Sequence, residues 1–578
     1  AATVGAMGRS VAAEKSGSPP HIFMMLADDW GSYDASWRMR ELGRVPDINT
    51  PNIDKLSAGG IRFANYYVQP ICTPTRSVLM SGRYSIHTGC EHILFGADEP
   101  SCLPTTFPIM PFAFKKLGYQ THMTGKWHLG YVNDTCSPWT RGFDTYLGYL
   151  NGVEGYYSHG MGPYMDFHEC VNDSIADPTA AAGARSTCDT CTHKYEGLYS
   201  TQVYTSHVEG IISRWQPGDK PLFVYLAWQA VHEPMDAPEE YTAPYSGIED
   251  PSRRIYAGML SCLDQGIGNI TSTLQASGLY ANSVLVLSND NGGMSGSYGI
   301  GCCNCGTSCG GLNYPFRGWK DSFWEGGFRG NGFVHSPLLD RTGYTYTPLL
   351  HVSDWYRTLL GAAMSRMSSS DREAAERVLE SVLASGPIDS VDQWRALATG
   401  GDLAATSGEP RSEILLAGID IDKKGAAIRV GDFKLLVGQW GADTWCDLNV
   451  TGFSPQAPAA PAPPQPEGPV GGKGGLVCIH LNTTAVTEQP SRGGPKPPWW
   501  EIVAGLYNVS ADPRELNDLQ HEFPQMVQKL MARLIYWNDT TVPSIHKPRD
   551  PAGTAHANAT NCWSPWANLT TAAASLWS

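Results

Sequence analysis

The fold follows from the stretch His21-Ile22-Phe23-Met24-Met25-Leu26-Ala27-Asp28-Asp29, an apolar run that ends in two acidic residues. Two later runs share this form. Leu222–Trp228 is followed four residues on by His232, and Val284–Ser288 is followed by Asp290-Asn291. Short apolar runs of this kind are typical of buried parallel strands. Ligands bind beyond the carboxyl ends of strands in open α/β sheets, so the three polar endings predict one site at one sheet edge.

Helical patterns lie between these runs. Apolar residues recur at helical spacing from Ile255 to Leu274, and Gly278 is a stop signal. Strands that alternate with helices predict a layered α/β domain. After about residue 405 the pattern changes to strand, turn and strand, over Ala427–Val430 and Phe433–Val437. A further strand at Tyr507–Val509 and a helix within Glu515–Leu534 complete a smaller antiparallel α+β domain.

A chain of 578 residues is too long for one simple core. We expect an N-terminal extension over 1–20, a catalytic domain over 21–405, a smaller domain over 406–545, and a tail over 546–578. The segment 455–475 is rich in Pro, Ala and Gly and is interpreted as a surface insertion. The last thirty residues or so are polar and are expected to be mostly extended.

The composition restricts the partners. The net charge is −15, from 41 basic and 56 acidic residues, which disfavours nucleic acid as a partner. An anionic substrate would need a local positive site. No apolar run approaches the roughly 18–20 residues of a membrane span. The first twenty residues lack the apolar core of a signal peptide, which fits numbering that starts after cleavage.

Cysteines and glycosylation sequons indicate a compartment. Fifteen cysteines are present, and setting Cys72 aside leaves an even number for disulfides. Together with the sequons, they indicate an oxidising, glycosylating secretory route, lysosomal or extracellular. The alternative is a cytosolic protein with scattered thiols and chance sequons. The sequons start at Asn133, Asn172, Asn269, Asn449, Asn482, Asn508, Asn538, Asn558 and Asn568.

Asp28, Asp29, Asp290 and Asn291 are candidate metal ligands. They offer only oxygen atoms, a donor set that suits calcium or magnesium rather than zinc. Either pair alone is better explained as a helix cap or a solvated turn. Two such pairs, each closing an apolar strand, favour a metal site.

Basic residues supply candidates for binding an anion. Lys126 and His128 lie two apart in Gly125–Gly130, so both would face the same way in an extended segment. Lys320 is a second candidate cation. A lone Lys is usually a solvated surface charge and a lone His a structural one, so none of the three stands out by itself.

Cys72-Thr73-Pro74-Thr75-Arg76 supplies a candidate nucleophile. Pro74 suits the first turn of a helix that runs to about Ser81, which would place Cys72 at a helix N-terminus, where the backbone favours anions. Arg76 would be a permanent cation beside it. The alternative is a buried or bridged cysteine.

These motifs resemble the type I sulfatases, whose Cys-x-Pro-x-Arg cysteine is oxidised after translation to formylglycine. The resemblance is strongest to the arylsulfatase B, or N-acetylgalactosamine-4-sulfatase, type and covers about residues 20–545. It implies an alkaline-phosphatase-like fold, with a large mixed, mostly parallel sheet sandwiched by helices. Supporting stretches are Thr50–Asp54, Cys72–Arg76, Gly125–Gly130, Arg141–Tyr146, Tyr156–His159, Ala230–Pro234, Asp290–Gly293, Trp324–Gly327 and Ala511–Pro513.

The resemblance implies hydrolysis of a sulfate ester on a small molecule or sugar. A calcium ion would be held by Asp28, Asp29, Asp290, Asn291 and formylglycine 72, the residue that a formylglycine-generating enzyme makes from Cys72. Arg76 and His128 would support the aldehyde hydrate. Lys126, Lys320 and His232 would bind sulfate, and His232 or Lys320 would protonate the leaving alcohol. Cleaving a sulfate ester needs these cations, a nucleophile and a proton donor.

The chain departs from the family pattern in three places. The first departure is Thr75, at a position where the family usually has Ser. We expect Cys72 to be converted to formylglycine despite this difference. The second departure is an insertion that contains the cysteines at 302, 303, 305 and 309. We expect this insertion to lie at the rim of the site and to be cross-linked by disulfides rather than to bind a metal. It could change which substrate the protein accepts. The third departure is the proline-rich insertion. The resemblance also implies a Cys102–Cys136 disulfide.

Two other functions stay open. One is a phosphatase or phosphonate hydrolase of the same superfamily, against which Cys72 and the His-free metal set count. The other is an inactive carbohydrate-binding relative, against which intact Lys126, His128, His232 and Lys320 count.

Overall fold

The structure of the chain is a computed structural model. It describes residues 17–91, 94–171, 188, 190–297, 301–302, 309–384, 386–400, 411–420, 425–438, 441, 445–447, 477–479 and 503–567.

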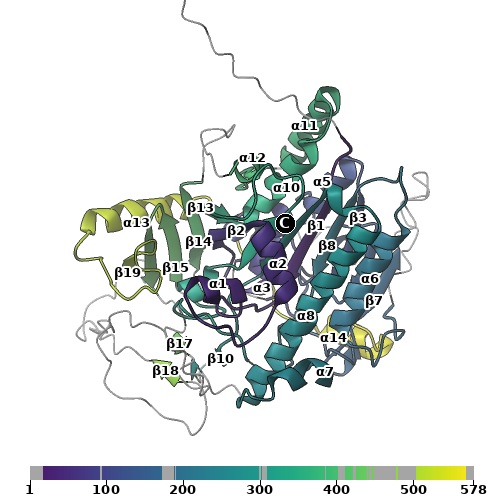
Figure 1. The fold of residues 1–578 in the computed structure, drawn as a ribbon, viewed down its shortest axis with the longest axis horizontal. Coiled ribbons are helices and arrows are strands. Elements are labelled where there is room, and N and C mark those ends of the chain that lie inside the picture. The colour runs from purple at the N-terminus through teal and green to yellow at the C-terminus, as the bar shows by residue number, and fades with distance from the viewer. Residues whose placement is uncertain are drawn as a thin grey trace, which may run out of the picture.

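A nine-stranded sheet in the order β13-β2-β12-β9-β1-β8-β3-β4-β7 forms the centre of the molecule (Figure 1). All its neighbouring strands are parallel except at β12 and β7, which run antiparallel to their partners. The predicted mixed, mostly parallel sheet is thus confirmed. Its strands are β1 His21–Ala27, β2 Ile61–Tyr67, β3 Gln120–Gly125, β4 Thr145–Gly148, β7 His168–Val171, β8 Leu222–Ala227, β9 Ser283–Asn289, β12 Gly332–His335 and β13 Tyr344–His351.

Helices cover both faces of this sheet. In β1, Ile22, Met24 and Leu26 belong to one core cluster and Phe23 and Met25 to the other, because successive strand residues point to opposite faces. The first cluster packs against α3 Cys72–Ser81, α5 Met110–Lys116, α10 Trp355–Met364 and α12 Trp394–Ala398. The second packs against α1 Ser36–Glu41, α2 Pro51–Gly59, α6 Ser200–Arg214 and α8 Pro251–Ala276. Figure 1 shows α2, α6 and α8 lying across the near face.

The helix predicted around Ile255–Leu274 is α8, which begins at Pro251 after an Asp250 cap. Asp250 accepts a hydrogen bond from the backbone N–H of Arg253, and proline suits the first turn because it has no N–H to leave unpaired. The remaining elements are the 15-residue helix α11 Ser369–Leu383 and the short α4 Ser85–Thr88, α7 Glu239–Thr242, α9 Glu325–Phe328, β5 Gly160–Met161, β6 Tyr164–Met165, β10 Gly296–Ser297 and β11 Gly301–Cys302.

A separate antiparallel sheet in the order β14-β15-β16-β19 follows the large one, as expected for the smaller domain. Its strands are β14 Glu413–Asp420, β15 Gly425–Val430, β16 Phe433–Gly438 and β19 Val503–Asn508, and α13 Pro524–Asn538 packs on it. The helix expected within Glu515–Leu534 therefore begins later, at Pro524. β17 Trp445–Asp447 pairs with β18 Val477–Ile479, and the proline-rich segment 455–475 lies outside the described residues.

The tail, which was expected to be mostly extended, contains a helix within its described residues 546–567. Residues Pro551–Thr560 form α14, with Asp550 as its N-cap and proline in its first turn. Four alanines within it favour the helix, and their small side chains give little apolar periodicity to detect. The tail is tied back to the large domain by the disulfide Cys191–Cys562.

Two further disulfides are described, Cys102–Cys136 and Cys170–Cys188. The first joins the pair that the family resemblance implied. Cys309 is also disulfide-bonded, as expected for the stapled insertion, while residues 303–308 lie outside the described residues. Among the helices that the structure describes, none is long and apolar enough to cross a membrane.

The sequons differ in exposure. Asn269, Asn538 and Asn558 are exposed, and Asn508 is half-buried. Asn133 is only 5 % exposed and its side-chain oxygen accepts hydrogen bonds from Thr135, so the structure disfavours a glycan there. The predicted sites Asn172, Asn449, Asn482 and Asn568 lie outside the described residues.

A buried ion cluster joins the two sheets. Lys434 on β16 lies with its Nζ 3.1 Å from Glu325 Oε1 and 2.8 Å from Glu515 Oε1. Arg329 Nη1 lies 2.8 Å from Glu325 Oε2, and the Tyr67 hydroxyl donates to the same oxygen. Burial raises the pKa of Glu515 to about 7 against the pull of Lys434. Burial alone would also raise the pKa of Glu325, but Lys434 and Arg329 lower it to about 2.

We expect Glu515 to make stability depend on pH. Between its ordinary pKa of 4.5 and its raised pKa near 7, the folded chain keeps a proton that the unfolded chain has lost. The free energy of unfolding therefore falls as pH rises through this window, by about 1–3 kcal/mol. Urea unfolding at pH 5, 6 and 7 should show a shallower decline for Glu515→Gln than for the parent, whereas the exposed control Glu522→Gln should keep the parent slope. Equal slopes for all three chains would contradict this assignment.

Candidate active site

Three neighbouring parallel strands deliver polar residues to one edge of the large sheet. Asp28-Asp29 follow β1, Asp290-Asn291 follow β9 on one side of it, and His232 lies in the loop after β8 on the other side. Cys72 is the first residue of α3 and faces them. Ligand atoms of Asp28, Asp29, Cys72 and His232 all lie within 4.8 Å of one another. The structure thus brings the predicted metal and catalytic residues into one cluster.

Three buried cations hold the carboxylates. Arg76 Nη2 lies 3.1 Å from Asp28 Oδ2 and 2.8 Å from Asp290 Oδ2. Lys126 Nζ lies 2.5 Å from Asp28 Oδ2, and Lys320 Nζ lies 2.7 Å from Asp29 Oδ1. Burial alone would raise the pKa of Asp28, but Lys126 and the other basic groups lower it far below the usual range. Burial raises the pKa of Asp290 to about 6, with Asp28 adding to the effect.

Cys72 is fully buried and makes no disulfide. Its Sγ lies 3.5 Å from Asp28 Oδ1, at the N-terminal end of α3. Burial raises the pKa of the Cys72 thiol, and Asp28 raises it further. An unmodified thiol here would therefore stay protonated and be a poor nucleophile.

Thr75, which departs from the usual Ser, keeps the contacts that a hydroxyl can make here. Its Oγ1 accepts a 2.9 Å hydrogen bond from the backbone N–H of Gln69 and donates toward the carbonyl oxygens of Gln69 and Asp290. The hydroxyl thereby ties the turn before α3 to the end of β9. The additional methyl group is accommodated within a fully buried side chain.

Lys126 and His128 reach the cluster, but the backbone between them is not a regular strand. His128 has a φ of 52°, in the left-handed region. The segment is held by hydrogen bonds from Lys126 N–H to the Ala227 carbonyl and from His128 N–H to the Leu150 carbonyl. Burial lowers the pKa of His128 well below its usual value, and Lys126 lowers it further. His128 Nδ1 is buried and has no hydrogen-bond partner among the described residues, so a neutral ring is presented.

His232 lies beside the second aspartate. Its Nε2 is 3.8 Å from Asp29 Oδ2, and its Nδ1 is 2.8 Å from the Glu233 carbonyl. Because a carbonyl only accepts, Nδ1 carries the hydrogen and a neutral ring presents an unprotonated Nε2 to the cluster. Burial lowers the pKa of His232, and Lys320 lowers it further. Lys320, by contrast, is already an ammonium donor beside the same aspartate.

Sequence reasoning missed two supports of these loops. Gln229 Oε1 accepts from Glu154 N–H, and Gln229 Nε2 donates to the Glu154 carbonyl, both at 2.7 Å. Asp166 accepts hydrogen bonds from the backbone N–H groups of Leu150 and Asn151. Gln229 could have been suspected because it precedes His232 in the loop after β8, whereas nothing in the sequence marks Glu154 or Asp166.

The residues present fit a hard divalent cation. Asn291 Oδ1 is buried and has no hydrogen-bond partner among the described residues, while Asn291 Nδ2 donates to Asp29 Oδ1 at 2.6 Å. A free amide oxygen beside three carboxylates is the donor set that calcium or magnesium prefers. Asp28, Asp29 and Asp290 balance Arg76, Lys126 and Lys320 in charge, so a divalent cation would leave the site positive and able to hold an anion.

The cations around the carboxylate cluster suit a hydrolase of anionic esters, and comparisons with known proteins identify the family. The sulfatase family model matches residues 20–365. Arylsulfatase J of Mus musculus is 36% identical over 556 residues, covering 95% of this chain and 80% of that protein. N-acetylgalactosamine-6-sulfatase of Canis lupus familiaris is 27% identical over 357 residues, covering 60% of this chain and 62% of that protein. The crystal structure of Ps i-CgsB in complex with k-i-k-neocarrahexaose has a similar fold, with a TM-score of 0.64 and 21% identity over 94% of this chain and 98% of that one.

The chain belongs to the sulfatase family. It is a sulfuric ester hydrolase, as the sequence motifs predicted. Its nearness to the arylsulfatase B type in particular stays a prediction.

Proposed function

We propose that this chain hydrolyses sulfate esters of carbohydrates through formylglycine at position 72 and a bound calcium ion. The observation that carries the proposal is the unpaired Cys72 at the start of α3, with its Sγ 3.5 Å from Asp28 Oδ1. The carbohydrate substrate is supported by the relatives, one named for an N-acetylgalactosamine sulfate and one crystallised with a carrageenan-type hexaose.

Calcium would be held by Asp28, Asp29, Asp290, Asn291 and residue 72. When bound, it would supply Lewis-acid stabilisation of negative charge on the sulfate oxygens. The remaining roles would fall to side chains of the protein. Arg76, which is buried and paired with Asp28 and Asp290, holds these two carboxylates together. His128, whose pKa is lowered by burial, is neutral and would accept a proton from residue 72.

Lys126 and Lys320 would bind the sulfate oxygens, and Lys320 or His232 would protonate the leaving alcohol. The geometry favours Lys320 as the donor, because its ammonium group carries the proton already. His232 would first have to take up a proton on Nε2. His232 then serves to orient the ester beside Asp29.

Cys72 is buried in the folded chain, so a formylglycine-generating enzyme would have to act before α3 packs against the sheet. We place the protein in the secretory route, lysosomal or extracellular. The disulfides Cys102–Cys136 and Cys191–Cys562 and the exposed sequons support that route.

Peptide mass spectrometry of residue 72 tests the proposal directly. We expect the mass of formylglycine rather than cysteine. Sulfate and phosphate esters of the same aryl alcohol then separate the remaining functions, and we expect strong preference for the sulfate. Preference for phosphate would favour a phosphatase, and no turnover of either ester by a modified chain would favour an inactive carbohydrate-binding relative.

Replacing Lys126 with alanine should lower kcat/KM for an aryl sulfate by roughly 10²–10³-fold, because one buried cation facing the developing charge is lost. Steady-state kinetics on purified chains of equal thermal stability measure this. Lys116→Ala removes an exposed lysine of α5 and should leave kcat/KM unchanged. An unaltered kcat/KM in Lys126→Ala would remove Lys126 from the site.

A further inference from the structure

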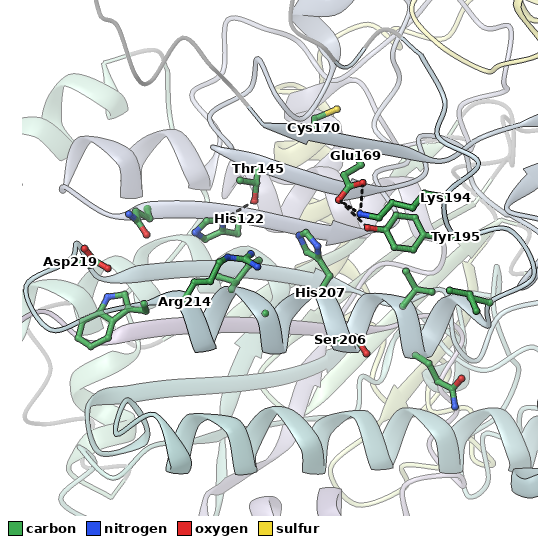
Figure 2. Close-up of a pocket in the computed structure, with 17 residues that line it drawn as sticks. His122, Thr145, Glu169, Cys170, Lys194, Tyr195, Ser206, His207, Arg214 and Asp219 are labelled. Carbon is green, nitrogen blue, oxygen red and sulfur yellow. Dashed lines mark hydrogen bonds and ion pairs between the residues drawn. The ribbon is translucent and has the colours of Figure 1, made fainter.

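A cavity of about 900 Å³ lies between α6 and the edge of the large sheet (Figure 2). Gln120 and His122 of β3, Thr145 of β4 and Glu169 of β7 line it from the sheet side. These β3 residues belong to the first half of the strand, whereas Lys126 follows its carboxyl end. None of the predicted active-site residues lines the cavity. It is therefore a separate place on the molecule, and its size is within the usual range for small-molecule sites.

Two imidazole nitrogens at this cavity have no partner. His122 Nδ1 lies 2.7 Å from Thr145 Oγ1, but His122 Nε2 is buried and makes no hydrogen bond with the described residues. His207 Nε2, on α6, is also buried and makes no hydrogen bond with the described residues. Unpaired buried polar groups are costly, so both nitrogens favour a ligand that can pair with them.

Arg214 adds a permanent positive charge. Figure 2 shows the side chains of His207 and Arg214 rising from α6 toward the strand that carries His122. No ion pair of Arg214 is found among the residues that the structure describes. Burial is the main cause that lowers the pKa of His122 and of His207 to about 4; Arg214 adds to the effect, while Asp144 opposes it at His122 and Glu169 at His207, so both rings are neutral at pH 7.

The acidic groups in and beside the cavity lining have partners of their own. Glu169 is paired with Lys194, whose Nζ lies 3.2 Å from both of its oxygens, and accepts from the Tyr195 hydroxyl at 2.9 Å. Asp144 is paired with Lys115 at 3.0 Å. Asp219 accepts from the backbone N–H of Gln216. Arg214 has no carboxylate partner among the described residues, so it can hold an anion beside the His122 and His207 nitrogens even though the whole chain carries −15.

We propose that this cavity binds an anionic saccharide unit, whose sulfate or carboxylate is held by Arg214, His122 and His207. Apolar side chains of Leu198, Val203 and Ile211 also line the cavity and suit the C–H faces of a sugar ring. The saccharide part of this inference rests on the proposed function, whereas the anion part rests on the three side chains. A site here would hold one part of an oligosaccharide, or a second chain of it, away from the reacting ester.

Protection of histidines from diethyl pyrocarbonate tests the site without relying on activity. The full-length chain is treated alone and with a chondroitin sulfate tetrasaccharide, the same tetrasaccharide after desulfation, or sodium sulfate, and carbethoxylation is read by peptide mass spectrometry. We expect the sulfated tetrasaccharide to slow modification of His207 by about fivefold or more. Equal protection by sodium sulfate at the same concentration would reduce the site to an inorganic anion site and overturn the saccharide part.

Protection of His128 and His232 reports the active site in the same experiment. If only these two are protected, the inferred cavity site is wrong while the proposed function stands. If His207 is protected in a chain that hydrolyses no sulfate ester, the cavity site stands and the proposed function fails.

Arg214→Gln supplies the matched variant. Because Arg214 is exposed, the change should leave folding intact, abolish protection of His207 and raise KM for the tetrasaccharide about tenfold. Turnover of a small aryl sulfate should not change. Arg377→Gln, at an exposed arginine of α11, should behave as the parent. Unchanged His207 protection in Arg214→Gln would overturn the inference.

Discussion

Replacing Cys72 with alanine should reduce turnover of an aryl sulfate by roughly 10⁴–10⁶-fold, the loss expected when a nucleophile is removed. The side chain is fully buried, lies 3.5 Å from Asp28 and makes no disulfide, so it has no alternative covalent role. Alanine leaves the helix α3 and its Pro74 intact. The loss should therefore appear in kcat with little change in thermal stability.

Two further variants sharpen this prediction. Cys72→Ser keeps an attacking hydroxyl but cannot become an aldehyde, so we expect no more than a single turnover in a burst assay. Cys262→Ala removes another buried, unpaired cysteine, on α8, and should keep parental turnover. Near-parental steady-state activity in Cys72→Ala would refute the proposed nucleophile.

Replacing Lys434 with methionine should lower the free energy of unfolding by about 3–5 kcal/mol, the cost typical of breaking a buried ion pair. Lys434 is fully buried between Glu325 and Glu515, and its ammonium group is within 3.1 Å of an oxygen of each. Methionine matches the length of the side chain but leaves Glu325 and Glu515 buried without the ammonium group between them. Urea unfolding followed by circular dichroism measures the loss.

A second substitution in the same ion cluster should restore part of the lost free energy of unfolding. The double variant Lys434→Met with Glu515→Gln removes one of the facing carboxylates, so it should recover part of the lost stability. Lys529→Met, at an exposed lysine of α13, should cost little. If Lys434→Met were as stable as Lys529→Met, the cluster would not hold the two sheets together.

The buried ion cluster around Lys434 is linked to the active site by backbone hydrogen bonds. Glu325 N–H donates to Glu515 Oε2 at 2.7 Å, so the smaller domain holds the start of α9. The adjacent Gly326 N–H donates to the Arg317 carbonyl, at the beginning of the segment that carries Lys320. Gly292 N–H, next to Asn291, donates to the Gly327 carbonyl. A destabilised cluster should therefore also impair the placement of Lys320 and Asn291.

Much of the central site could be predicted because its residues follow strongly patterned elements. The runs at Ile22–Ala27 and Val284–Leu287 are apolar throughout, and each is soon followed by the polar pair that enters the cluster, Asp28-Asp29 or Asp290-Asn291. Cys72 was placed by Pro74, which marks the first turn of a helix. The tail helix α14 gave no such signal, because alanines confer helical propensity without an apolar stripe.

The extended segment expected at Lys126–His128 shows another limit. Both side chains reach the cluster, yet His128 adopts a φ of 52° because its backbone is tied to Leu150 and that of Lys126 to Ala227. Such long-range backbone hydrogen bonds override the local preference for a strand. No pattern in the sequence reports them.

By itself, the sequence determined the kind of chemistry and the strands that carry it, since residue type and periodicity are local properties. Only the tertiary structure decided which charges are paired and which polar atoms are left without partners. Lys434 reads as an ordinary strand lysine until Glu325 and Glu515 are seen beside it, and His122 and His207 become notable only when one cavity brings them to Arg214. Pairing and burial depend on residues far apart in the chain, and they set the energies from which these functions follow.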